Sequence, residues 1–338
     1  MEEDEALMSR YCLLIFAIIG LTIIGGCVYM DENNINNASN ISNSNFILKT
    51  IIRRLEAGES FGTSEIMQYQ NDSNIISGLA ESMQGRSAEY RSATAEMLVD
   101  LGRPEIPAQG SLPARQAPYV NNIEVVGQLV SMLEDPDSNV RNLASEALLE
   151  EVPDPIIRNY TAEIIENVRK HPDTDLGALL LGKTGAEAAG RLIRSDPLIR
   201  DASLEDTHLA LARLGDREAE DSFIQAFKEA ARPSELAEAA RQLGYLATVR
   251  ATLTLAQDIR NPGVYVWRMQ SERSVRLHII EGLHLIFLTE EIFFKPFFKP
   301  EDDSYYEGIE RWITENLGVT WDQPRPPFLY EEDAPILP

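Results

Sequence analysis

Apolar residues recur at three- and four-residue steps along most of the chain from residue 46 onward, which places them on one face of a helix. The run Val125, Val126, Leu129, Met132 and Leu133 is typical. Strand signals are nearly absent, because no run of alternating β-branched residues stands between glycine-rich turns. Prolines fall between the helical stretches, where they begin or end helices; they are Pro136, Pro153, Pro155, Pro197, Pro233 and Pro262. The pattern therefore predicts an all-α body.

The first 30 residues carry a different pattern. Residues 11–30 (YCLLIFAIIGLTIIGGCVYM) contain no charged side chain. At a rise of about 1.5 Å per residue, a helix of this length crosses the ~30 Å hydrocarbon core of a bilayer. We therefore predict that residues 1–30 form a hydrophobic N-terminal helix that attaches the protein to a membrane.

Two forms of this attachment stay open. One is a single-pass anchor, and the other is a bacterial lipoprotein signal, because residues 24–27 (Ile-Gly-Gly-Cys) resemble a lipobox. That resemblance makes Cys27 the candidate for lipidation, and we favour it. The acidic residues 2–5 depart from the basic start of a signal peptide, a conflict that translation from Met8 would remove.

The distribution of charge predicts the orientation of the chain. Arg10 is the cation beside the apolar segment, and the next one is Lys49. Because positive charge favours the cytoplasmic side, we expect an extracytoplasmic body. Residues 31–46, rich in Asn and Ser, cannot offset the entropy of ordering and are predicted to be a flexible linker. The folded body then covers residues 47–289, followed by a C-terminal block at 290–338.

Copies of one pattern occur within the body. Residues 214–227 (LGDREAEDSFIQAF) and 246–259 (LATVRATLTLAQDI) superpose at an offset of 32, and residues 181–194 (LGKTGAEAAGRLIR) are a weaker copy offset by 33. Ala186, Ala219 and Ala251 then share one column. A period near 30 residues with helical content is typical of solenoids built from helix pairs.

A second pattern places an apolar residue before an arginine, followed by small and apolar residues at helical spacing. It occurs at Arg91, Arg141 and Arg276. Residues 132–148 (MLEDPDSNVRNLASEAL) are its best example and resemble HEAT repeats of the short, bilin-lyase-like type. The resemblance covers residues 75–288 and implies a right-handed α-solenoid of HEAT-like helix pairs.

The resemblance also assigns roles to residues. Asp137 would cap the second helix of a pair. Arg91, Arg141 and Arg276 would form a ladder of Arg–Asp contacts between adjacent repeats. The alternative for these arginines is a solvated surface position.

Two segments depart from the repeats. Residues 102–122 (GRPEIPAQGSLPARQAPYVNN) read as a loop inserted between helix pairs. In the C-terminal block, the amphipathic residues 305–317 and the acidic, proline-rich tail are predicted to cap the last pair. The doubled Phe-Phe-Lys-Pro phrase offers an alternative, an aromatic surface for a partner; its residues are Phe293, Phe294, Phe297 and Phe298.

Composition limits the chemistry. The net charge of −24 disfavours binding to nucleic acid, and both cysteines lie in the N-terminal segment. The four histidines show no i, i+4 metal spacing and no His-Glu pair of the deoxyhypusine hydroxylase type; they are His171, His208, His278 and His284. Residues 182–184 (Gly-Lys-Thr) are similar to the end of a phosphate-binding loop but lack its preceding glycine, so we interpret them as a turn.

These observations predict no catalytic residue, no cofactor and no metal. The function that we expect is a membrane-tethered HEAT-repeat scaffold or adaptor that binds a protein partner through a concave helical surface. The alternative is a chromophore- or cofactor-associated lyase, as in the bilin lyases that share this repeat type. Fold alone does not imply that activity.

Overall fold

The structure is a computed structural model that describes residues 37–70, 72–107, 114–174, 176–230, 232–260, 264–267, 271–293 and 303–322. The predicted hydrophobic helix, Cys27, Phe294, Phe297 and Phe298 lie outside these residues. Within them, no helix has the length and apolar character needed to cross a membrane. The chain divides into Met1–Phe46 and Ile47–Pro338, and the description below concerns the second unit.

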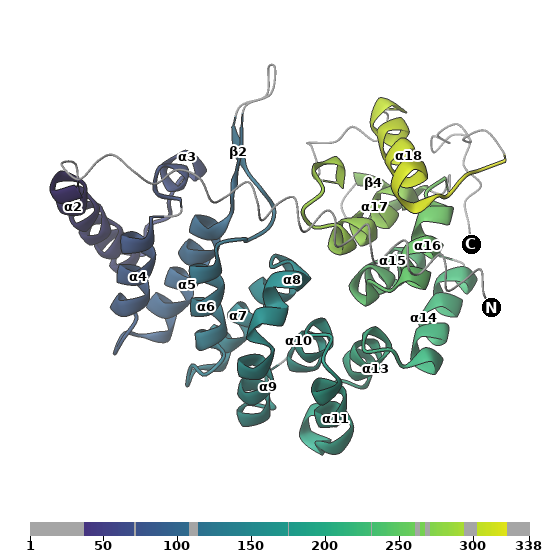
Figure 1. Ribbon diagram of the computed structural model, residues 1–338, viewed down its shortest axis with the longest axis horizontal. Helices are drawn as coiled ribbons and strands as arrows, with labels where there is room; N and C mark the ends of the chain where they lie inside the picture. Colours follow the sequence, from purple (N-terminus) through teal and green to yellow (C-terminus); the bar gives the residue numbers. More distant parts are fainter. Residues whose placement is uncertain are drawn as a thin grey trace. The chain divides into compact units, whose positions relative to one another are not determined.

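The described part is helical, with two short hairpins (Figure 1). Its first helices are α2 (Asn37–Glu56), α3 (Thr63–Ile66), α4 (Ser73–Ser82), α5 (Ala88–Gly102), α6 (Ile123–Met132), α7 (Ser138–Glu150), α8 (Asp154–Ile157), α9 (Thr161–Lys170) and α10 (Gly177–Lys183). They are followed by α11 (Glu187–Ser195), α12 (Pro197–Ala202), α13 (Leu204–Arg213), α14 (Arg217–Glu229), α15 (Pro233–Leu246), α16 (Val249–Asp258), α17 (Val275–Ile286) and α18 (Asp303–Leu317). Single 3-10 turns occur at Met67–Tyr69, Arg158–Tyr160 and Glu291–Phe293.

Side-chain caps explain where many of these helices begin. An oxygen of the capping side chain accepts a hydrogen bond from a backbone N–H of the first turn, which otherwise lacks a partner. The caps of α4, α5, α6, α7, α12, α13, α14 and α16 are Asp72, Ser87, Asn122, Asp137, Asp196, Ser203, Asp216 and Thr248. The helix boundaries therefore follow directly from short polar residues in the sequence.

Helices that are neighbours in sequence pack in pairs, and helices of different pairs also contact one another; we sort these contacts into two sets, called the first and the second row. In the first row α5, α7, α10, α13, α15 and α17 each contact the next member. In the second row α4 contacts α6, α9 contacts α11, and α14 contacts α16, which contacts α18. A side chain on the first row can therefore reach the pairs before and after its own.

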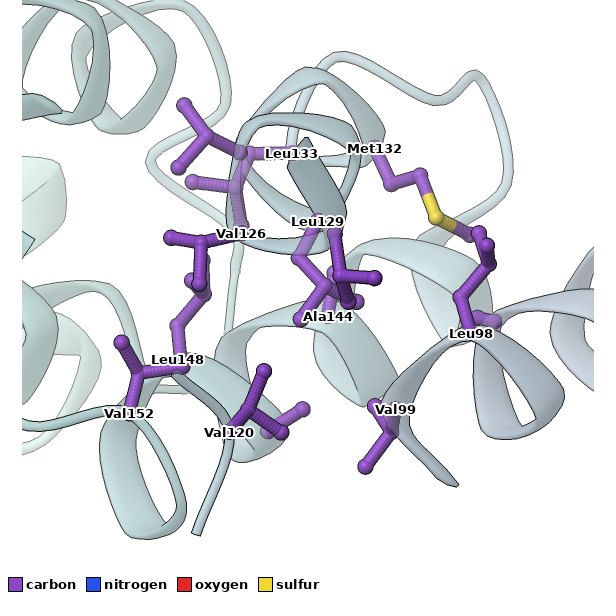
Figure 2. Close-up of a cluster of buried hydrophobic side chains, with 14 of the residues drawn as sticks. Leu98, Val99, Val120, Val126, Leu129, Met132, Leu133, Ala144, Leu148 and Val152 are labelled. Carbon is purple, nitrogen blue, oxygen red and sulfur yellow. The ribbon is translucent and has the colours of Figure 1, made fainter. Parts of the chain in front are cut away.

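The apolar core consists of two main clusters that meet at α10 and α13. Figure 2 shows part of the first cluster, to which α5, α6 and α7 contribute Leu98, Leu129 and Leu148. Each of these leucines is fully buried, a burial that stabilises the fold by about 1.5–3 kcal/mol per side chain. On α10, Leu180 belongs to the first cluster and Leu179 to the second.

The structure differs from the sequence prediction at two hairpins. The predicted loop 102–122 contains strands β1 (Glu105–Ile106) and β2 (Arg115–Gln116), which pair antiparallel. A second antiparallel hairpin joins β3 (Val264–Trp267) to β4 (Ser271–Ser274). Strands of two and four residues are too short to produce a recognisable alternation of apolar and polar residues.

The start of α2 and the position of one alanine also differ from the prediction. Helix α2 begins at Asn37, inside the stretch that the sequence predicts to be a flexible linker. Extending a formed helix adds one hydrogen bond for each residue fixed, so Asn and Ser can continue a helix that they would not start. Ala219 and Ala251 both donate to the cap of their helix, but Ala186 is itself the cap residue of α11. The three alanines that share one column in the sequence therefore do not occupy equivalent positions in their helices.

Candidate functional site

The arginines singled out from the sequence lie in the first turns of α5, α7 and α17. Arg91 donates to both carboxylate oxygens of Asp135 at 2.7 Å, 44 residues along the chain. Arg141 donates to Asp173 at 2.6 Å, 32 residues along, and to the carbonyl oxygen of Asp135 at 2.9 Å. Arg276 is buried and donates to the carbonyl oxygen of Arg260 at 3.2 Å. Arg91 and Arg141 thus each link their helix to the turn that precedes a later helix of the first row.

Asp137 caps α7. One of its carboxylate oxygens accepts hydrogen bonds from the backbone N–H of Asn139 at 2.9 Å and of Val140 at 3.4 Å. The preceding acidic residue, Asp135, also accepts from the backbone N–H of Asp137 at 2.9 Å. Asp135 and Asp137 therefore hold the turn before α7, and Asp135 also accepts hydrogen bonds from Arg91 and Arg141.

Phe293 does not belong to an exposed aromatic surface. Its side chain is fully buried, stacked on Phe287 at 5.8 Å and edge-on to Trp312 of α18 at 4.9 Å. An aromatic side chain at this position stabilises the contact of α18 with the helices before it. The structure therefore corrects the partner-surface interpretation for Phe293, while Phe294, Phe297 and Phe298 lie outside the described residues.

Seven carboxylates on helices of the first row, or directly after them, are linked by electrostatic contacts and hydrogen bonds, in part through Arg241 and Gln242, and we call this set the acidic face. Its members are Asp100, Glu146, Glu150, Glu151, Glu205, Asp206 and Glu238, from α5, α7, α13 and α15 or the residues that follow them. Glu151 interacts electrostatically with Asp100 and Glu146. Glu150 interacts with Arg241, and this arginine also interacts with Asp206 and Glu238. Gln242 donates to Glu205 at 2.6 Å. The set therefore extends from α5 to α15, and Arg241 and Gln242 link its members on α7 with those on α13 and α15.

The carboxylates of this face are crowded. Burial among protein atoms raises the pKa values of Asp100, Glu150 and Glu151, and neighbouring carboxylates raise those of Glu150 and Glu151 further. Arg103 opposes these effects, because it lies 2.6 Å from Asp100 and 2.7 Å from Glu151. Glu150 is nevertheless exposed to solvent.

A hollow between α14 and α15 adjoins the acidic face. It is lined by Ala226, Glu229, Ala230, Ser234, Glu235, Glu238, Ala239 and Gln242, the last of which joins it to Glu205. Glu235 and Glu238 pair with arginines on their own side of the helix, Arg232 and Arg241. Exposed pairs of this kind contribute about 0.2–1 kcal/mol, so cations of a ligand can replace them.

A charged cluster is buried at the contact of α7, α10 and α13, and we call it the Lys183 cluster. The Lys183 Nζ donates to the carbonyl oxygens of Leu148, at 3.1 Å, and of Leu149. Burial lowers the pKa of Lys183 to about 7. Arg213 pairs with Asp154 and lies 4.8 Å from the ring of Tyr245. The sequence predicts a turn at residues 182–184. In the structure, Gly182 and Lys183 instead end α10, and only Thr184 follows the helix.

Neither the acidic face nor the Lys183 cluster is predicted by the sequence. The members of the acidic face are spread from residue 100 to 238, so no local pattern joins them. A signal was present for Lys183, because it ends the otherwise uncharged helix GALLLGK.

Groups that could hold a metal ion are not found among the residues that the structure describes. His278 lies on α17 and contacts Glu281 of the same helix at 2.8 Å.

A comparison of the chain with models of known protein families finds no match, and a comparison with curated proteins finds none either.

Proposed function

We propose that the protein is a non-catalytic scaffold or adaptor whose acidic face binds a lysine- or arginine-rich segment of a partner protein. The observation that carries this proposal is the extent of the acidic face over α5, α7, α13 and α15. Burial is the main cause that raises the pKa values of Glu150 and Glu151, and cations of a partner would relieve the repulsion from neighbouring carboxylates that adds to it. An acidic surface also attracts a basic partner during diffusion, which increases the rate of association.

The magnitudes indicate what kind of segment would bind. A single exposed ion pair contributes about 0.2–1 kcal/mol, whereas a Kd near 1 μM needs about 8 kcal/mol. Charge alone is therefore insufficient, and apolar contacts have to supply the rest. Ala226, Ala230 and Ala239 in the hollow leave room for the aliphatic stems of lysine or arginine side chains.

In this proposal the helices form a right-handed, HEAT-like α-solenoid. The support for it is the arrangement in two rows, together with the contacts of Arg91 with Asp135 and of Arg141 with Asp173 between pairs. Solenoids of this kind bind proteins along an extended surface that several pairs build together.

Residues 1–30 attach the scaffold to a membrane in this proposal, and the body is extracytoplasmic. The test is the mass of the mature N-terminus. A chain that begins with an acylated Cys27 supports the lipoprotein, whereas a chain that retains residues 8–30 supports the single-pass anchor. A soluble chain that has lost residues 1–30 without lipid contradicts both.

Binding to the acidic face is tested with the detergent-solubilised full chain and two synthetic helical peptides, one rich in lysine and alanine and one with glutamate in place of each lysine. We expect the lysine peptide to bind, with an affinity that falls steeply between about 0.05 M and about 0.5 M salt. The glutamate peptide should not bind. Equal binding of the two peptides, or none by the lysine peptide, contradicts the proposal.

A further inference from the structure

Lys183, the last residue of α10, connects two helices of the first row through one buried nitrogen. Lys183 is 5% exposed, and its Nζ donates to the carbonyl oxygens of Leu148 and Leu149. Both carbonyls lie in the last turn of α7, where the helix itself provides no donors. The contact lies where the two apolar clusters meet on α10. Lys183 is therefore a buried link between the two halves of the core.

No carboxylate contacts Lys183 among the residues that the structure describes. Asp154 of α8 acts on it but pairs with Arg213 of α13, and Glu150 of α7 acts on it from a solvent-exposed position. Tyr245 of α15 is uncharged, since burial raises its pKa and its hydroxyl donates to the carbonyl oxygen of Leu179. No charged group of α9, α11 or α12 among these residues acts on Lys183. A protonated Lys183 is therefore held by two carbonyl oxygens, without a carboxylate in contact.

We propose that Lys183 makes the contact of α7, α10 and α13 a proton-sensitive joint in the first row. An uncompensated ammonium is unfavourable in a dry interior. Protonation therefore favours states in which α10 opens and water reaches Lys183. Deprotonation favours the closed joint, in which the amine still donates to the end of α7.

Titration supports the direction of this effect. Burial is the largest cause that lowers the pKa of Lys183 from 10.5 to about 7; Asp154 and Glu150 raise it, and Arg213 lowers it. In the open joint, water returns the pKa to its ordinary value. Between pH 7 and pH 10.5, the pKa values of Lys183 in the closed and the open joint, the open state binds more protons than the closed state. Opening therefore becomes less favourable as the pH rises through this range. Below pH 7 both states are protonated, and the dependence ends.

The joint divides the acidic face. Glu146 and Glu150 lie on α7, before α10, whereas Glu205 and Glu238 lie on α13 and α15, after it. Opening at α10 would separate these two groups of carboxylates and weaken the binding of a segment that spans them. This consequence for binding rests on the proposed function, whereas the joint itself does not.

Hydrogen exchange followed by mass spectrometry tests the joint in the full chain between pH 6 and pH 9. The opening equilibrium of α10, corrected for intrinsic exchange, should fall about 50-fold from pH 7 to pH 9 and only about twofold from pH 6 to pH 7. Helix α5 should show no such fall. In Lys183→Met the α10 equilibrium should be independent of pH.

An equal fall in the native chain and in Lys183→Met would overturn the proposal. If Lys183→Met loses its helical circular dichroism, Lys183→Arg replaces it; because this residue stays charged, opening should remain as frequent at pH 9 as at pH 7. A flat profile for α10 in the native chain overturns the proposal without any variant. Neither measurement uses a partner, so failure of the joint and failure of peptide binding are distinguishable.

Discussion

Gly244 of α15 and Gly282 of α17 bring the backbones of their helices into direct contact. A Cβ atom on Gly244 would lie 2.6 Å from the Cα atom and 2.5 Å from the carbonyl oxygen of Gly282. A Cβ atom on Gly282 would lie 2.5 Å from the carbonyl oxygen of Ala240. Because both obstacles are backbone, no side-chain rotation can relieve them. The last part of the first row therefore depends on these two glycines.

Gly244→Ala should lower the free energy of unfolding by about 1–3 kcal/mol, because the two helices must move apart and lose packing. Gly62→Ala is the matched control, since a Cβ atom there meets nothing within 4 Å. Urea denaturation measures both variants. Equal stability of Gly244→Ala and the native chain would show that α15 and α17 do not approach so closely.

Asp135→Asn should cost about 2–3 kcal/mol of unfolding free energy, because it weakens two charge-assisted hydrogen bonds to Arg91 and leaves that guanidinium poorly paired. A substitution of the preceding residue, Glu134, is the control. Glu134 pairs with Lys170 on the surface, so Glu134→Gln should change stability by less than about 0.5 kcal/mol. Equal losses for the two variants in denaturant titrations would remove the structural role of the Arg91–Asp135 contact.

Ala247→Gly should stabilise the protein by about 0.5–1 kcal/mol. Ala247 ends α15 with a φ of 51°, a left-handed conformation that costs an alanine about 1–2 kcal/mol and that glycine adopts freely. The greater entropy of glycine in the unfolded chain offsets part of the gain. Thermal unfolding measures the change. Ala93→Gly, inside α5, should destabilise instead.

Glu150→Gln should slightly stabilise the free chain at pH 7, by less than about 1 kcal/mol because the side chain is solvent-exposed. The pKa of Glu150 is raised by burial and by Glu146, so the folded chain holds this proton to a higher pH than the unfolded chain does. The stability contributed by this group therefore falls as the pH rises above 4.5, the ordinary pKa of a glutamate side chain.

Unfolding measured between pH 4.5 and pH 7 should show a smaller loss of stability in Glu150→Gln than in the native chain. The same variant should weaken binding of the lysine peptide, which separates the role of Glu150 in binding from its effect on stability. A variant that is less stable at pH 7 would contradict the crowded environment described for this carboxylate.

Local signals in the sequence account for much of the fold. Pro136 and Asp137 mark the start of α7, and the spacing of Val126, Leu129 and Leu133 identifies the buried side of α6. Local signals fail where structure depends on contacts between distant residues. The β1–β2 hairpin is held by the pairing of Glu105 with Gln116, and strands of two residues carry no local pattern that predicts this pairing.

The candidate site could not be predicted for the same reason. The partners of Lys183 are 34 and 35 residues away on α7, so its burial is invisible in a reading of α10 alone. Glu150 and Glu238 both act on Arg241 because contacts of α7, α10, α13 and α15 join these helices in one row. The sequence shows that the chain is acidic, but the packing decides where the charge gathers.

The comparison that tests the acidic face most directly uses two double variants with the same change in net charge. Glu150→Gln with Glu238→Gln alters the face, whereas Glu187→Gln with Glu218→Gln alters exposed carboxylates of α11 and α14 in the second row. Fluorescence anisotropy with the lysine peptide gives the Kd of each. The account predicts at least a tenfold weaker Kd for the first pair, about 1.4 kcal/mol, and less than a twofold change for the second. Equal Kd values for the two double variants would contradict a binding site on the acidic face.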